Sequence, residues 1–132
     1  MSPYFIGALV LCGLQRMEAQ RPPPPTGNYS SPVAEDCVEV WFDETVRLRV
    51  NCGLNIVFSD PLKVMEKNPN YFMLNDSEGY NKFAREVAED CPRQLQKGDL
   101  TFYDHYSNKN LIKSQYQGGP IILSPGKCTF RM

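Results

Sequence analysis

The segment from Asn75 to Pro92 reads Asn75-Asp76-Ser77-Glu78-Gly79-Tyr80-Asn81-Lys82-Phe83-Ala84-Arg85-Glu86-Val87-Ala88-Glu89-Asp90-Cys91-Pro92. Its apolar residues recur at i, i+3, i+4, i+7, i+8 and i+11, namely Tyr80, Phe83, Ala84, Val87, Ala88 and Cys91. This spacing predicts an α-helix with one buried face. Asn75, Asp76 or Ser77 can cap its start, and Pro92 ends it. The opposite face is polar, with Lys82–Glu86 and Arg85–Glu89 at ion-pair spacing.

Residues 38–50 alternate apolar and polar side chains on both sides of Asp43-Glu44-Thr45, which predicts a β-hairpin. The inner face should pair Phe42 with Val46, Val40 with Leu48, and Val38 with Val50; the outer face should pair Glu39 with Arg49 and Trp41 with Arg47. A slip of one residue would mix the faces, so the pattern specifies the register. Trp41 stacked on Arg47 is either an exposed contact anchor or a residue that a loop covers.

Turn residues divide the rest of the chain into short segments. We expect strands over 54–58, 100–106, 111–116, 121–123 and 128–132, a short helix over 62–67 after Asp60-Pro61, and no assignment for 71–74. The expected fold class is therefore α+β, with an antiparallel β-sheet packed on one main α-helix and stabilised by disulfides.

The first 36 residues differ in composition from the remainder. Residues 1–19 resemble a secretory signal peptide, because the apolar run 4–14 is too short to span a bilayer and Ala19 suits the cleavage position. Residues 20–36, with four consecutive prolines at 22–25, are interpreted as an extended Pro-rich linker. Residues 37–132 are then a single α+β domain, and the protein is expected to be secreted.

Removal of the signal peptide would remove Cys12 and leave four of the five cysteines, an even number that predicts two disulfides. Cys52 shares the core-facing parity of the hairpin and Cys91 ends the apolar helix stripe, so Cys52–Cys91 and Cys37–Cys128 are the preferred pairs. Four cysteines allow three pairings, and the alternatives stay open. No C-x-x-C motif occurs, and we expect no metal and no cofactor.

Catalytic motifs are absent from the sequence: it contains no G-x-S-x-G, Walker A or H-E-x-x-H pattern. The only histidine, His105, is next to Asp104 on a strand, where the two side chains point to opposite faces. Tyr103, His105 and Tyr106 are candidate binding residues on the late sheet, together with Trp41 and Arg47 on the hairpin. Asn28-Tyr29-Ser30 and Asn75-Asp76-Ser77 are N-glycosylation sequons, and the sequence does not show whether either is used.

A signal peptide, a small chain, few cysteines and the order hairpin, helix, sheet are together similar to small secreted effectors of plant-pathogenic fungi. The ribonuclease-like effectors of powdery mildews share this order, with a first cysteine bridged to a near-terminal one, and the resemblance would cover 37–128. This chain differs from those effectors at Glu35, where they usually have an aromatic residue. Active members of the ribonuclease fold use a second histidine, so the resemblance implies a non-catalytic virulence protein that binds a host protein.

Three functions are therefore considered. The first is a secreted, non-enzymatic interaction protein with a protein partner, such as a host protein bound by a pathogen effector. The second is a small ribonuclease-type hydrolase that uses His105, and the third is a secreted inhibitor. The net charge of −1 argues against nucleic acid or an anionic membrane as the general partner.

Overall fold

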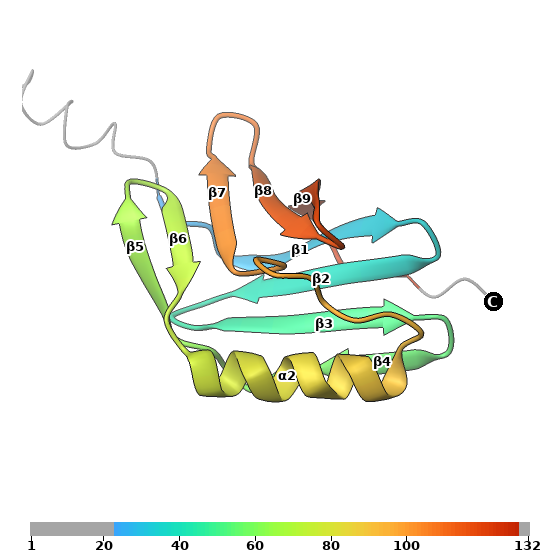
Figure 1. Ribbon diagram of the computed structural model, residues 1–132. Coiled ribbons are helices and arrows are strands. Elements are labelled where there is room, and N and C mark those ends of the chain that lie inside the picture. Colours follow the sequence, from blue (N-terminus) through green and yellow to red (C-terminus); the bar gives the residue numbers. More distant parts are fainter. Residues whose placement is uncertain (1–22, 130–132) are drawn as a thin grey trace, which may run out of the picture.

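The computed structural model describes residues 23–129, and the expected signal peptide lies outside this range (Figure 1). Within these residues, one helix, α2 (Ser77–Asp90), accompanies nine strands. The strands are β1 (Gly27–Val33), β2 (Asp36–Phe42), β3 (Val46–Cys52), β4 (Asn55–Phe58), β5 (Val64–Asn68), β6 (Tyr71–Leu74), β7 (Phe102–Tyr106), β8 (Leu111–Tyr116) and β9 (Gly119–Pro125).

All neighbouring strands are antiparallel and form one curled sheet in the order β4-β3-β2-β1-β9-β8-β7-β6-β5. The inner face of β2 and β3 meets the inner face of β7, β8 and β9, and α2 lies along β3 and β4 (Figure 1). The expected antiparallel sheet with one main helix is present, but the domain is more dominated by its sheet than the sequence indicated.

The hairpin of β2 and β3 has the predicted register at all five expected pairs, including Glu39 with Arg49 and Trp41 with Arg47. The inward side chains are buried: Val38, Val40, Phe42, Val46, Leu48 and Val50. Phe42 makes edge-to-face contacts with Tyr29 and Tyr103, at centroid distances of 5.7 and 5.2 Å. Such pairs contribute roughly 0.5–1.5 kcal/mol beyond their buried area, so this aromatic cluster joins the two halves of the sheet.

Helix α2 begins as predicted, with the Asp76 carboxylate accepting the N–H of Gly79 at 3.0 Å. Phe83, Val87 and Cys91 are buried, but Ala88 is exposed, so the buried stripe is narrower than its sequence pattern. Lys82 pairs with Asp60 at 3.0 Å. A side-chain carbon added at Gly79 would lie 2.6 Å from Leu62, so the helix needs glycine where it crosses this residue.

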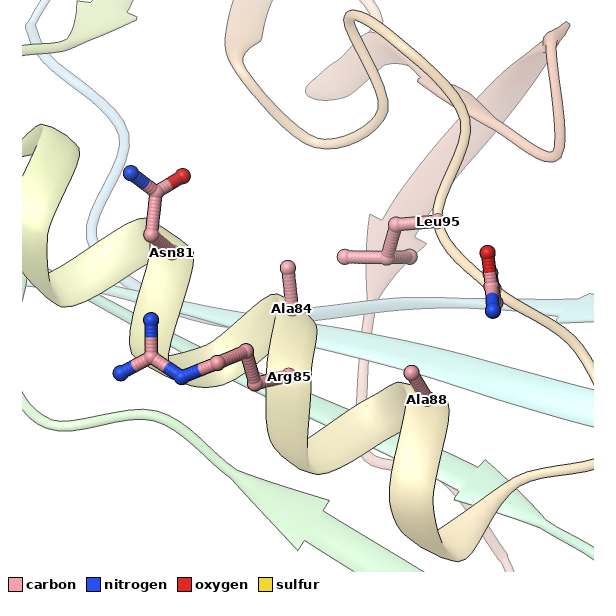
Figure 2. A pocket seen from close by; sticks show the side chains of 6 residues that line it. Asn81, Ala84, Arg85, Ala88 and Leu95 are labelled. Atoms are coloured by element: carbon pink, nitrogen blue, oxygen red, sulfur yellow. The ribbon is translucent and has the colours of Figure 1, made fainter.

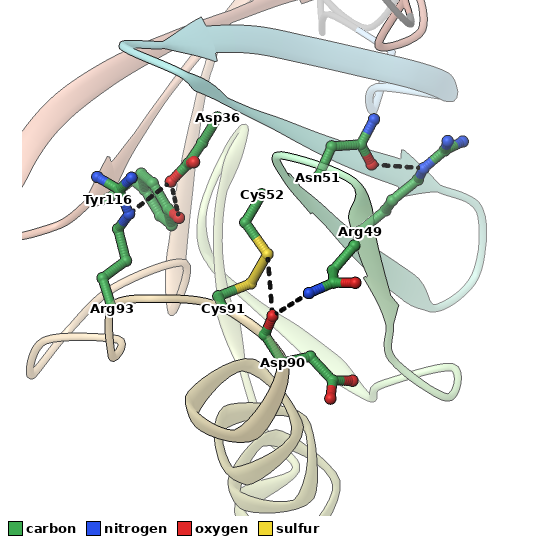
Figure 3. Close-up of a disulfide and its surroundings, with 9 residues drawn as sticks. Asp36, Arg49, Asn51, Cys52, Asp90, Cys91, Arg93 and Tyr116 are labelled. Atoms are coloured by element: carbon green, nitrogen blue, oxygen red, sulfur yellow. Dashed lines mark hydrogen bonds and ion pairs between the residues drawn. A yellow bond between two sulfur atoms is a disulfide. The ribbon is translucent and has the colours of Figure 1, made fainter.

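Both predicted disulfides form. Cys52–Cys91 ties the end of β3 to the end of α2, and the Asn55 side chain donates to the Asp90 carbonyl beside it at 2.6 Å (Figure 3). Cys37–Cys128 ties the C-terminal segment to β2.

Three sequence-based assignments are wrong. Residues 27–33 of the expected linker form β1, which pairs with both β2 and β9 and buries Tyr29. The expected helix over 62–67 is replaced by β5, because Leu62 exchanges two backbone hydrogen bonds with Val46 and so commits the chain to an extended path. Cys128 and Thr129 are not in a strand, since the disulfide and not a ladder holds them; residues 130–132 lie outside the described range.

Candidate functional site

Four side chains on the outer face of β2, β3 and β4 form what we call the aromatic–arginine face: Trp41, Arg47, Arg49 and Phe58. The guanidinium carbon of Arg47 lies 5.0 Å from the centre of the Trp41 ring, and that of Arg49 lies 5.3 Å from the centre of the Phe58 ring. Trp41 is 46% exposed and Phe58 is 60% exposed. Each arginine therefore stacks on an aromatic ring at the surface.

The local sequence explains this arrangement. Side chains alternate between the two faces of a strand. Because the apolar residues of β3 face the core, Arg47 and Arg49 both point to the outer face. Cross-strand pairing then places Trp41 opposite Arg47, and Phe58 opposite Arg49. The Cα atoms of Arg47 and Arg49 are about 7 Å apart along the strand by standard strand geometry, and each guanidinium group is flanked by one ring, on β2 for Arg47 and on β4 for Arg49.

Arg49 is held in place by further contacts. Its Nε donates to Asn51 Oδ1 at 2.9 Å (Figure 3), and one terminal nitrogen lies 3.9 Å from the Glu39 carboxylate. Glu39 is itself buried, and its carboxylate accepts the backbone N–H of Cys128 at 2.8 Å. The disulfide between Cys37 and Cys128 fixes that backbone. The C-terminal segment therefore keeps one half of the face in a defined arrangement.

Arg47, in contrast, is exposed: its guanidinium stacks on the Trp41 ring, and within the described part of the chain its side chain makes no hydrogen bond or ion pair. No carboxylate of residues 23–129 lies within ion-pair distance of it. A guanidinium that stacks on a ring keeps its edge N–H groups available, and these suit a carboxylate in a bidentate contact. Arg47 can therefore receive an anionic group from a partner.

The structure separates the five sequence-predicted binding residues. Trp41 and Arg47 lie together on the outer face, as predicted, and Tyr106 is 42% exposed at the end of β7. Tyr103 is fully buried, and its hydroxyl donates to the Leu100 carbonyl within the core. His105 is also buried. Tyr103 and His105 are therefore not surface residues, because their strand parity points them inward with Ile112 and Tyr116.

His105 joins two turns at one end of the sheet. Its Nε2 lies 3.0 Å from Asn110 Oδ1, its Nδ1 lies 3.5 Å from Asn70 Oδ1, and its backbone N–H donates to the Asn70 carbonyl. The Tyr29 hydroxyl donates to the same Asn110 oxygen at 2.6 Å. Burial raises the pKa of Tyr29 above its ordinary value, which keeps this donor protonated. The arrangement suits a structural histidine better than a catalytic one.

Two hollows lie elsewhere on the surface. A groove of about 430 Å³ runs between α2 and the segment that follows it, lined by Asn81, Ala84, Arg85, Ala88, Gln94 and Leu95 (Figure 2). A second hollow, of about 600 Å³, lies beside the Cys37–Cys128 disulfide and includes Asp36 and Lys127 in its lining. His105 lines neither of them.

Arg49 and Phe58 were not predicted as site residues from the sequence. Arg49 has the same parity as Arg47, and this signal could have identified it. Phe58 ends β4, a strand that was expected, but its position opposite Arg49 depends on how β4 pairs with β3. Strand parity therefore predicts the position of Arg49 but not that of Phe58.

Within residues 23–129, no cluster of three or more His, Cys, Asp or Glu side chains is placed to hold a metal ion, and no helix is long and apolar enough to cross a bilayer. No protein-family model, curated protein or solved structure matches this chain.

Proposed function

We propose that this chain is a secreted, non-enzymatic interaction protein that binds a partner protein through the aromatic–arginine face. The observation that carries the proposal is the Trp41–Arg47 pair, an exposed stacked pair whose arginine has no carboxylate partner in the described residues. Two disulfides and the signal-peptide-like residues 1–19 support secretion.

The residue types favour a protein as the partner. Tryptophan and arginine are the residues in which the energy of protein–protein interfaces concentrates. The chain's net charge is −1, and the nearby Glu39 partly neutralises Arg49, so the face is not a strongly basic surface of the kind that nucleic acid requires. A partner that offers a carboxylate to Arg47 and an apolar group to Trp41 and Phe58 fits the face best. A host protein is the partner that the resemblance to fungal effectors implies.

The test compares paired surface variants in a quantitative capture experiment from host extract. Trp41→Ala and Arg47→Gln change the face, and Ile122→Ala and Lys113→Gln are control changes of an exposed apolar side chain on β9 and an exposed cation on β8. We expect one specific partner to be recovered by the wild type and both controls but lost with both face variants. Loss of about 2 kcal/mol at an interface hot spot would weaken the dissociation constant of the purified partner about thirty-fold.

The result against the proposal is equally definite. If Trp41→Ala and Arg47→Gln retain every partner that the wild type captures, the face is not the binding surface. Incubation of the folded protein with RNA tests the hydrolase hypothesis separately: we expect cleavage at background level, unchanged in His105→Ala. Cleavage that disappears in His105→Ala would overturn the non-enzymatic proposal and show that the buried histidine becomes accessible.

A further inference from the structure

The two N-glycosylation sequons lie in very different places in the fold. Asn75 is an exposed residue of the loop between β6 and α2, and Ser77 of the same sequon is also exposed. The Asn75 backbone N–H donates to the Lys63 carbonyl at 2.8 Å, which anchors the loop, while no described residue hydrogen-bonds to its side chain. Asp76, the middle residue of this sequon, caps α2 with its carboxylate. A group attached to the Asn75 side chain would therefore disturb no contact of the fold.

Asn28 is the second residue of β1, the strand that lies between β2 and β9, and it is paired with Trp41 of β2. It is half-buried, its side-chain oxygen is inaccessible, and the oxygen has no hydrogen-bond partner among residues 23–129. The backbone of this sequon is also constrained, because every residue of β1 is paired with a residue of β2. An attached oligosaccharide here would have to displace packed neighbours.

We infer that Asn75, and not Asn28, carries an N-linked oligosaccharide when the protein passes through a eukaryotic secretory pathway. The Asn75 side-chain nitrogen forms a bond to the anomeric carbon of the first sugar, loses one proton, and displaces the pyrophosphate of a lipid-linked oligosaccharide donor. The glycan is a bulky, soluble group and requires a surface position, which the loop provides. The inference takes secretion from the proposed function but is independent of the partner.

The experiment is expression in a eukaryotic secretory cell line, once with the chain's own residues 1–19 and once with a host secretory leader placed before Gln20. Intact mass is measured before and after treatment with an amidase that removes N-glycans and converts the modified asparagine to aspartate. We expect one glycan, with the conversion mapped to Asn75. The host leader separates failure of the chain's own signal from failure of the site.

Four variants make the assignment specific. Asn75→Gln and Ser77→Ala should remove the glycan, because each destroys the sequon, whereas Ser77→Thr should retain it. Asn28→Gln should leave the glycan unchanged. A secreted protein without a glycan at Asn75, or one with a glycan at Asn28, would overturn the inference. Absence of a glycan at Asn75 would not bear on partner capture by the aromatic–arginine face, which the Trp41 and Arg47 variants test. A glycan at Asn28 would lie beside Trp41 on the same side of the sheet, and partner capture would then be compared between the wild type and Asn28→Gln.

Discussion

Replacement of Asp99 should destabilise this domain strongly, although the residue takes no part in the proposed site. Its side chain is fully buried, and each carboxylate oxygen accepts two hydrogen bonds. The donors are Gln96 N at 2.7 Å and Gln117 N at 2.9 Å to Oδ2, and Gly118 N and Gln115 Nε2, both at 3.0 Å, to Oδ1. Asp99 thus connects the segment after α2 to the turn between β8 and β9.

The magnitude follows from these four bonds. Hydrogen bonds to a charged group contribute roughly 1.5–3 kcal/mol each, and a buried donor left without a partner costs about 1–3 kcal/mol. The full sum is not expected, because water can reach some of these donors once the side chain is shortened. We therefore expect Asp99→Ala to lower the free energy of unfolding by roughly 3–5 kcal/mol, as when one partner of a buried charged network is removed. That is a large part of the stability of a domain of this size.

Asp99→Asn separates the loss of hydrogen-bond acceptors from the loss of side-chain volume as the cause of destabilisation. The two side chains have nearly the same shape, but the amide nitrogen of asparagine donates and cannot accept. Because both oxygens accept two bonds, either orientation of the amide places its NH₂ group against two N–H donors. We expect this variant to lose at least about 2 kcal/mol. Asp90→Asn, with an exposed side chain, is the control and should change stability by less than about 0.5 kcal/mol.

The assay is urea unfolding followed by far-ultraviolet circular dichroism, with both disulfides intact in every variant. Midpoints and slopes should be compared, because a changed slope would indicate a changed denatured state and not only lower stability. If Asp99→Asn unfolds within about 0.5 kcal/mol of the wild type, the reasoning about the four donors is refuted.

Three further predictions concern the helix, the disulfides and a tyrosine. Phe83→Ala should lower the free energy of unfolding by roughly 3–5 kcal/mol, because the ring is 1% exposed; a loss under about 1 kcal/mol in the same urea assay would show that α2 is not part of the core. Under limiting thiol, Cys37–Cys128 should be reduced before Cys52–Cys91, because Cys37 is half-buried whereas Cys52 and Cys91 are buried; alkylation and peptide mapping check the order, and prior reduction of Cys52–Cys91 would contradict it. Burial and the nearby Asp99 raise the pKa of Tyr80 to about 12. The protonated Tyr80 therefore contributes fully to the free energy of unfolding below pH 10, and this contribution is lost as the pH rises from 10 to about 12. Tyr80→Phe should therefore remove one late-titrating phenol from the ultraviolet absorbance titration and make stability fall less over this pH range; loss of a phenol that titrates near pH 10 instead would show that Tyr80 ionises normally.

Local pattern was sufficient for the elements whose faces differ clearly in polarity. The helix 77–90 and the register of β2 with β3 followed from side-chain periodicity, because a one-residue error in either would bury charge or expose the core. The parity of Cys52 and the helix stripe ending at Cys91 favoured the two disulfide pairs that form, but left the other pairings open. The Trp41–Arg47 contact followed from the same register. This half of the candidate site was therefore readable from the hairpin sequence.

Tertiary structure alone determined the elements without such a difference. Asp60-Pro61 is a helix-start signal for residues 62–67, yet the backbone hydrogen bonds between Leu62 and Val46 make this region extended. The polar segment 27–33 becomes β1 because β2 and β9 offer it two edges to pair with. Asp99 is in a turn by its sequence, and it becomes a buried anion only because the N–H groups of Gln117 and Gly118 are folded against it. The stacking of Phe58 on Arg49 likewise depends on β4 returning beside β3, since a single strand contains no information about which ring its neighbour will supply.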